Sequence, residues 1–201
     1  MTRIAVLVSG GGTNLQALID AWKSGALGTG ELSLVISSKP GVYALERAKK
    51  AGIKSVTIER KKFATAEDFD AAVCTTLSEE NISLVVLAGF LSVVGTLVLK
   101  KYENRIINVH PALIPSFCGK GFYGLRVHEA VLKSGVKITG ATVHLVNEVV
   151  DGGKIILQKA VNVLPDDTPE SLQQRVMREA EWVILPKAVE MFCKGEIVVS
   201  I

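Results

Sequence analysis

The chain has 201 residues, of which 48% are hydrophobic, and 23 Lys and Arg against 20 Asp and Glu give a formal net charge of +3. This length is typical of one domain, and so much apolar material excludes an intrinsically disordered chain. The only dense basic cluster is Arg60-Lys61-Lys62, whereas a nucleic-acid-binding surface normally needs a basic face or stripe. We therefore expect a single domain over residues 1–201 whose partners are small molecules and not nucleic acids.

The first 110 residues alternate short apolar runs with amphipathic runs. The pattern predicts strands at residues 4–8, 32–36, 55–58, 84–88 and 105–109, and helices at 14–23, 42–51 and 66–80. Gly52 is placed to end the second of these helices. Strands that alternate with helices in this way indicate parallel βαβ units with right-handed crossovers.

An uncharged stretch at residues 81–99 is long enough to cross a bilayer. Polar residues and glycines interrupt it, and its dense apolar part, residues 84–91, has the length of a buried strand. We therefore expect no membrane span. No signal peptide is recognisable either, because Ser9 and three glycines directly follow the first apolar run.

The chain after residue 110 changes pattern. A helix is predicted at residues 127–132, and strands at 138–146 and 154–163 flank a turn with Asp151-Gly152-Gly153, which suggests an antiparallel hairpin. We therefore expect an α/β, Rossmann-like fold with a mostly parallel central sheet, helices on both faces and an antiparallel C-terminal extension.

The last part of the chain is predicted to be helical. Thr168 suits the N-cap position, and Pro169 and Glu170 suit the first turn. A long helix should follow to about residue 194, with a bend at Pro186. A short final strand is expected at residues 196–199.

The cysteines and histidines do not form metal or disulfide patterns. Cys74, Cys118 and Cys193 are odd in number and widely spaced, which disfavours a disulfide framework and fits reduced thiols in a cytoplasmic protein. The three histidines lack the spacing of paired ligands, so no metal is expected.

Three glycines at residues 10–12 precede Thr13 and Asn14 between the first predicted strand and helix. Glycines there let backbone N–H groups converge, and a helix N-terminus adds partial positive charge, which suits a phosphate. The dinucleotide pattern fails because Leu15 stands at its third glycine, and no Gly-Lys-Ser/Thr follows as a P-loop requires. A phosphate monoester site and a tight turn both remain open.

Asn108 and His110 lie two residues apart at the end of a predicted strand, so their side chains share one face. Ligands of open α/β sheets bind beyond such strand ends. An amide and an imidazole can both donate to a developing oxyanion, although a packed histidine is an equally good interpretation. Asp151 could orient an imidazole or simply form an Asp-Gly turn. His128 and His144 are interpreted as core residues, with His144 alternatively supporting the site.

Four motifs, in this order and spacing, resemble one family. They are Ser9-Gly-Gly-Gly-Thr-Asn-Leu15, Leu87-Ala-Gly-Phe90, Ile107-Asn-Val-His-Pro-Ala-Leu-Ile-Pro115, and Gly140-Ala-Thr-Val-His144 continuing to Asp151-Gly-Gly153. Over essentially the whole chain they resemble the phosphoribosylglycinamide formyltransferases of purine biosynthesis. The Asn-x-His-Pro element is typical of folate-dependent formyl transfer in general, and the glycine-rich element narrows the resemblance to the glycinamide ribonucleotide branch.

The resemblance implies that a substrate amine attacks the formyl carbon of 10-formyltetrahydrofolate directly, without a metal. Asn108 and His110 would stabilise the tetrahedral oxyanion, and Asp151 would raise the pKa of His110 and hold an ordered water. Thr142 and His144 would support these residues from behind.

The resemblance also implies two binding regions and a monomer or homodimer. The ribonucleotide phosphate would lie on Gly11, Gly12, Thr13 and Asn14, with Glu181 contacting the same substrate. The folate would lie against Leu91, Ser92, Val93, Val94, Asn108, Asn147 and Glu148. Residues up to about 110 would thus form a phosphate-binding half of the domain, and residues from about 111 a folate-side half.

The chain departs from the family in a few places. Ser92 and Ala66 stand where basic residues are frequent on the folate side, and residues 117–124 replace a shorter stretch. The spacing from Arg175 to Glu181 is one residue longer than the family pattern.

Three other functions stay open. A formyltetrahydrofolate deformylase would pass the formyl group to water, but deformylases usually carry an extra N-terminal domain. Methionyl-tRNA formyltransferases share the core but add a C-terminal RNA-binding domain, which we do not expect here. A non-catalytic nucleotide-binding module would bind phosphate ligands without turnover.

Overall fold

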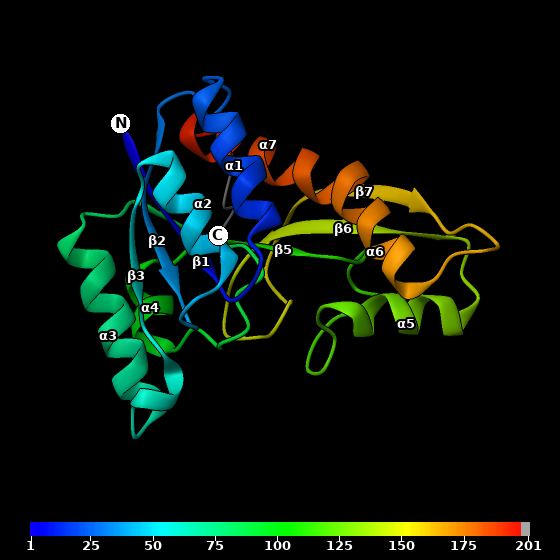
Figure 1. Cartoon of the computed structure of the whole chain (residues 1–201), viewed down its shortest axis with the longest axis horizontal. Helices are drawn as coiled ribbons and strands as arrows, with labels where there is room; N and C mark the ends of the chain where they lie inside the picture. The colour runs from blue at the N-terminus through cyan, green and yellow to red at the C-terminus, as the bar shows by residue number, and fades with distance from the viewer. Residues whose placement is uncertain (198–201) are drawn as a thin grey trace.

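A computed structural model of the chain describes residues 1–197, so the strand expected at 196–199 extends outside the described residues. Seven strands form one sheet in the order β3-β2-β1-β4-β5-β6-β7 (Figure 1). They are β1 (Thr2–Val8), β2 (Gly30–Ser37), β3 (Lys54–Thr57), β4 (Leu84–Leu87), β5 (Ile106–His110), β6 (Ile138–Leu145) and β7 (Ile155–Asn162). The first five strands pair in parallel, whereas β6 and β7 pair antiparallel. The predicted mixed sheet is therefore confirmed.

Helices follow most strands, close to their predicted bounds. They are α1 (Thr13–Lys23), α2 (Tyr43–Ala51), α3 (Ala66–Glu79), α4 (Thr96–Lys101), α5 (Leu125–Ser134), α6 (Pro169–Val176) and α7 (Trp182–Cys193). Gly52 ends α2 in the left-handed conformation, as predicted. Thr168 accepts a hydrogen bond from the amide of Ser171 and caps α6, also as predicted. No helix within residues 1–197 combines the length and apolar character that crossing a membrane requires.

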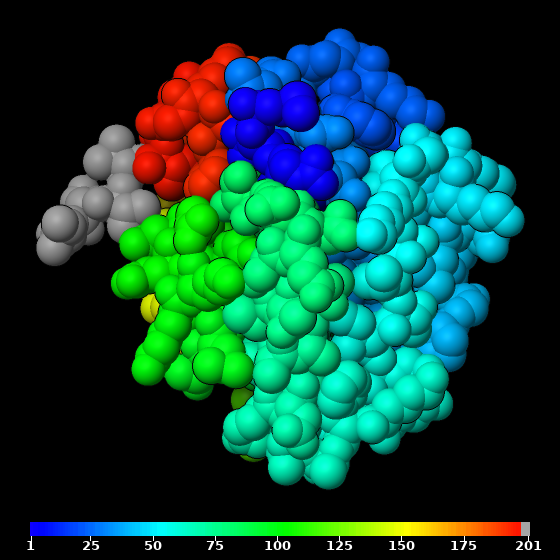
Figure 2. Space-filling model, turned by 90° about the vertical axis from the view of Figure 1, so that its left-hand side faces the viewer, coloured from blue at the N-terminus to red at the C-terminus, as the bar shows by residue number. Residues whose placement is uncertain are grey.

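The sheet is buried on both faces, and β1 shows how its residues divide. Ile4, Val6 and Val8 pack on one face with residues of α1, α2, α5, α6 and α7, which we call the α1 face. Ala5 and Leu7 pack on the other face with residues of α3 and α4, which we call the α3 face. Figure 2 shows α3 beside the green segment that contains α4. A parallel sheet covered on both sides explains why its strands read as continuous apolar runs.

Helix α4 was not predicted from the sequence. Its N-terminus is capped from another helix, because the carboxylate of Asp70 in α3 accepts hydrogen bonds from the amides of Gly95 at 2.8 Å and Leu97 at 2.7 Å. The N-cap residue itself, Gly95, contributes no side-chain cap. A cap supplied by a residue 25 positions away leaves no local signal.

The C-terminal helical region contains an irregular segment that was not predicted. Pro186 lies inside α7, and a π-helical segment, η2 (Met177–Glu181), separates α6 from α7. A π turn closes over one more residue than an α turn. The segment begins after Arg175 and ends at Glu181, and α6 and α7 on either side of it both pack on the sheet.

Candidate active site

A cavity of about 690 Å³ lies beyond the carboxyl ends of β1, β4 and β5, where open α/β sheets bind their ligands. Every site residue proposed from the sequence lines it except Thr142. These residues come from segments far apart in the chain, namely Gly11, Gly12, Thr13, Asn14, Leu91, Ser92, Val93, Val94, Asn108, His110, His144, Asn147, Glu148, Asp151 and Glu181. The sheet topology thus brings both predicted binding regions to one opening.

The three glycines of the first loop are not equally required by the fold. Gly12 has a φ of +71°, and a Cβ there would lie 2.7 Å from the Cβ of Ala44, so the fold itself requires this glycine. Gly10 and Gly11 have neither constraint, since nothing lies within 4 Å of a Cβ built on them. A tight turn therefore explains Gly12 alone. The two other glycines leave the backbone open to the cavity.

The first turn of α1 is available to an anion. Gly12 is its N-cap and supplies no side-chain acceptor for the first helical amides, which carry partial positive charge. Arg47, which the sequence analysis did not single out, donates from Nε to the carbonyl of Gly11 at 2.9 Å and fixes the loop from outside. Ser9 also stabilises the region, because its hydroxyl accepts from the amide of Leu91 at 2.8 Å.

Asn14 and Glu181 form a buried pair at the bottom of this loop. The Nδ2 of Asn14 donates to Oε2 of Glu181 at 2.5 Å. Burial raises the pKa of Glu181 to about 7, and the hydrogen bond from Asn14 opposes the shift only partly. The side-chain amide of Asn14 therefore donates to Glu181. The backbone N–H groups of the glycine loop remain as the main hydrogen-bond donors for an anion.

The antiparallel pairing of β5 with β6 places His144 opposite Asn108. The Nδ1 of His144 lies 2.8 Å from the carbonyl of Leu145, which can only accept, so Nδ1 carries the proton. Nε2 is then free to accept from Nδ2 of Asn108, which lies 3.0 Å away. This contact fixes the Asn108 amide and leaves its second N–H for another acceptor.

His110 is held between a loop and a carboxylate. Its Nε2 lies 2.8 Å from the carbonyl of Phe117, so this nitrogen carries a proton. Its Nδ1 lies 3.6 Å from Oδ2 of Asp151, and the same oxygen accepts from the amide of Gly119 at 2.8 Å. The other oxygen of Asp151 lies 3.6 Å from Nε2 of His144. The predicted trio of Asn108, His110 and Asp151 is therefore assembled, with His144 linking two of its members.

The pKa of His110 does not move in the direction expected from the sequence. Burial lowers it below the ordinary value, and the attraction of Asp151, which acts upward as expected, is the smaller effect. Burial acts to raise the pKa of Asp151, but the nearby imidazoles of His144 and His110 and the hydrogen bond from the amide of Gly119 together outweigh it and leave the pKa lowered. At neutral pH the pair therefore consists of a neutral imidazole and an ionised carboxylate.

Thr142 lies opposite His110 in the pairing of β5 with β6, but its hydroxyl forms hydrogen bonds with the chain after His110. Its hydroxyl donates to the carbonyl of Ala112 at 2.7 Å and accepts from the amide of Ile114 at 3.0 Å. It thereby shapes the turn that follows His110.

The cavity residues that the sequence analysis did not assign to the site include His128, Gln173 and Met177. These three belong to α5, α6 or η2 on the α1 face. Helical residues of this kind carry no local signal, because only the packing of α5 and α6 onto the sheet brings them to the cavity.

Another part of the cavity lining, which we call the apolar wall, is hydrophobic and open to solvent. Leu91, Val93 and Val149 are 55%, 78% and 64% exposed, although their side chains are hydrophobic. Phe90 and Val94 beside them pack against the core of the α3 face. Such a group of exposed apolar side chains around a cavity is typical of a binding surface for a flat apolar ligand.

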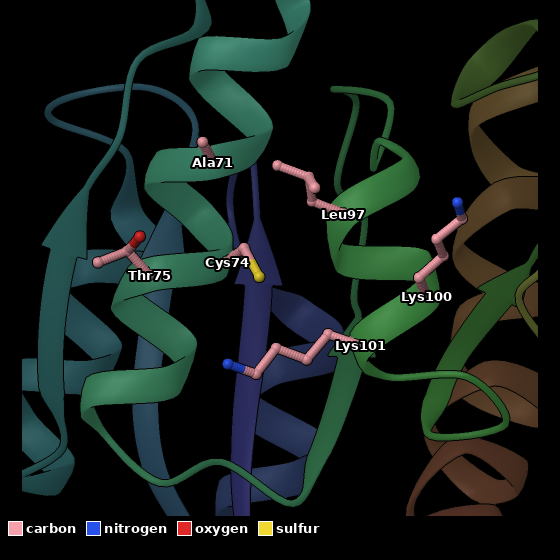
Figure 3. Close-up of a pocket in the computed structure, with 6 residues that line it drawn as sticks. All are labelled: Ala71, Cys74, Thr75, Leu97, Lys100 and Lys101. Carbon is pink, nitrogen blue, oxygen red and sulfur yellow. The ribbon is translucent and has the colours of Figure 1, made fainter.

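A second, shallower hollow lies between α3 and α4 (Figure 3). Cys74 and Lys101 lie between the two helices, whereas Lys100 points away from them. Lys101 donates to the hydroxyl of Ser78 at 2.5 Å. This hollow has no paired acid and base, so the larger cavity is the candidate active site. Within residues 1–197, no three His, Cys, Asp or Glu side chains gather as metal ligands would.

Comparison with known proteins identifies the family. The family model described as formyl transferase matches residues 2–189. The chain belongs to the formyl transferase family. This formyl transferase is 38% identical to phosphoribosylglycinamide formyltransferase of Haemophilus influenzae, over 98% of its own length and 90% of that protein's. Its fold matches glycinamide ribonucleotide transformylase 1 of Symbiobacterium toebii with a TM-score of 0.94 and 41% identity, over 100% of this chain and 91% of that one.

Other relatives are much longer than this formyl transferase. It is 43% identical to the trifunctional purine biosynthetic protein adenosine-3 of Drosophila melanogaster over 98% of its own length, but it spans only 14% of that protein. The shared part is therefore one formyl transferase unit within a larger chain. Membership of this family implies a folate-type co-substrate.

Proposed function

We propose that this formyl transferase moves the formyl group of 10-formyltetrahydrofolate to the amine of 5-phosphoribosylglycinamide. The products are formylglycinamide ribonucleotide and tetrahydrofolate, and the step belongs to purine biosynthesis. The observation that carries the proposal is the group formed by Asn108, His110, His144 and Asp151, which lies in one cavity between the glycine loop and the apolar wall.

The ribonucleotide phosphate binds at the loop Gly11, Gly12, Thr13 and Asn14, on backbone amides at the start of α1. Glu181 contacts the ribonucleotide from η2. The pterin ring of the folate lies against Leu91 to Val94, with Asn147 and Glu148 at its rim. The substrate amine and the formyl carbon then meet at the end of β5, next to Asn108 and His110.

The amine nitrogen attacks the formyl carbon, and the carbonyl oxygen becomes an oxyanion. Asn108 donates its second amide N–H to this oxyanion, because its first is taken by His144. The amine proton passes to the free Nδ1 of His110, and the nearby carboxylate of Asp151 stabilises the resulting imidazolium. As the tetrahedral intermediate collapses, the same proton goes to the departing folate nitrogen, so atoms and charge balance.

A spectroscopic assay of folate deformylation tests the proposal. We expect deformylation of 10-formyltetrahydrofolate only when 5-phosphoribosylglycinamide is present, with a rate about 10²–10⁴ times lower for His110→Ala. Deformylation without the ribonucleotide would instead make the protein a hydrolase. Ribonucleotide binding with no reaction under any condition would make it a binding module.

A further inference from the structure

His128 differs from the other two histidines of this cavity in having no partner. Both ring nitrogens of His110 face polar atoms, and so do both nitrogens of His144. His128 is 0% exposed, and neither of its ring nitrogens has a hydrogen-bond partner among the described residues. A buried polar group left unpaired destabilises the fold that contains it. Its occurrence beside an active site calls for a functional reason.

The position of His128 indicates which ligand it serves. It lies on α5 and lines the cavity together with Gln173, Met177 and Glu181. α5 packs on the α1 face, as the glycine-loop helix α1 does. The apolar wall, with Phe90 and Val94, belongs to the opposite face. His128 therefore lies on the side of the proposed ribonucleotide and away from the proposed pterin.

The electrostatics of His128 restrict the chemistry of its partner. Burial lowers its pKa to about 4, and the nearby His110 contributes to the shift. At neutral pH its imidazole is uncharged and offers one N–H donor and one lone-pair acceptor. Such a ring is a poor match for a dianionic phosphate and a good match for a neutral group that both donates and accepts.

We propose that His128 hydrogen-bonds the glycinamide amide of the ribonucleotide and so determines recognition of that part of the substrate. The proposal rests on the proposed function. In the proposed complex the reacting amine lies at His110. The carbonyl carbon of the amide is only two bonds from the amine nitrogen, so an imidazole near His110 is within reach of the amide.

Isothermal titration calorimetry with two probes tests this role. Glycinamide ribonucleotide carries the amide, whereas ribose 5-phosphate has the phosphate and sugar alone. For His128→Leu we expect glycinamide ribonucleotide to bind about tenfold more weakly, as expected for one lost hydrogen bond, and ribose 5-phosphate to bind as in the wild type. His128→Gln, which keeps a donor and an acceptor, should restore part of the affinity.

Melting temperatures distinguish a role of His128 in substrate recognition from a role in packing. His128→Leu should raise the melting temperature of the free enzyme, because it removes two unpaired polar atoms from the interior. Val131→Ala, at a fully buried position of the same helix, is the packing control and should lower the melting temperature without changing either affinity.

Three results would overturn the proposal. Equal weakening of both probes would show a general effect on cavity shape, and no weakening of either would show a core histidine. A wild-type protein that binds ribose 5-phosphate and gains nothing from the glycinamide part would refute it as well. Calorimetry needs no turnover, so a failure of formyl transfer is seen separately in the deformylation assay.

Discussion

The cavity has two walls that differ in polarity and in exposure to solvent. The glycine-loop wall, formed by residues 10–14 and Glu181, is polar and fixed by buried hydrogen bonds such as that from Asn14 to Glu181. The apolar wall, formed by residues 91–94 and 149–150, presents the exposed hydrophobic side chains of Leu91, Val93, Val149 and Val150. A polar wall rejects ligands that leave its groups unpaired, whereas an apolar wall contributes affinity in proportion to the area covered. We therefore expect substrate specificity to reside mainly on the first wall.

The catalytic group between the walls should show the largest effect. Asn108→Ala removes the N–H that we propose donates to the oxyanion, so we expect kcat to fall by about 10²–10³ with little change in either KM. Steady-state kinetics with each substrate varied in turn measures this. A raised KM with an unchanged kcat would mean that Asn108 only binds substrate.

The polar wall should make stability depend on pH through Glu181. Its pKa in the folded chain is about 7, above the ordinary 4.5, so between these values the native state holds a proton that the unfolded chain has lost. Stability is therefore greatest below pH 4.5 for this group and falls by about 3 kcal/mol as the pH rises through 7.

The matched variant Glu181→Gln should lose this dependence. Its unfolding free energy relative to the wild type should increase between pH 5 and pH 8 in denaturant titrations. If the unfolding free energies of the two proteins changed in parallel with pH, ionisation of Glu181 would not destabilise the folded state.

Within the glycine loop, we expect Gly12 to be required for stability and Gly11 for binding of the ribonucleotide. Gly12→Ala should destabilise the protein by about 1–2 kcal/mol or more, because alanine disfavours positive φ and its Cβ meets Ala44. Gly11→Ala should leave the melting temperature unchanged but raise the ribonucleotide KM about tenfold, since its methyl group enters the cavity. Equal melting temperatures for both variants would contradict this division.

The apolar wall should show the smallest effect. Val93→Ala removes two methyl groups from a side chain that a bound pterin would cover. We expect the folate KM to rise about three- to tenfold and the ribonucleotide KM to stay constant. A change in the ribonucleotide KM alone would reverse the proposed assignment of the two walls.

The sequence was sufficient for features that local patterns encode. Apolar runs gave the strands, and the position of Asn108 and His110 at a strand end placed them in the cavity. Glycine spacing identified the loop but could not separate the turn glycine Gly12 from Gly11, because that difference depends on contact with Ala44.

Features that depend on tertiary contacts were not predictable. α4 is capped by Asp70 from another helix, and the π segment η2 between α6 and α7 has no local sequence signal. Asp151 acts on the pKa of His110 in the predicted direction, but the net shift is downward because burial, which no sequence pattern measures, is the larger effect. His128 was interpreted as an ordinary core residue because its lack of partners is visible only in the folded chain.

The central claim is that the two walls hold two substrates at once and that the formyl group passes directly between them. Transfer of an isotopic label tests it: 10-formyltetrahydrofolate labelled in the formyl group is incubated with the protein and 5-phosphoribosylglycinamide. For the wild-type protein we predict that the label is recovered quantitatively in formylglycinamide ribonucleotide. For His110→Ala we predict that it appears neither in that product nor in formate. Label released as formate at a rate independent of the ribonucleotide would contradict the claim.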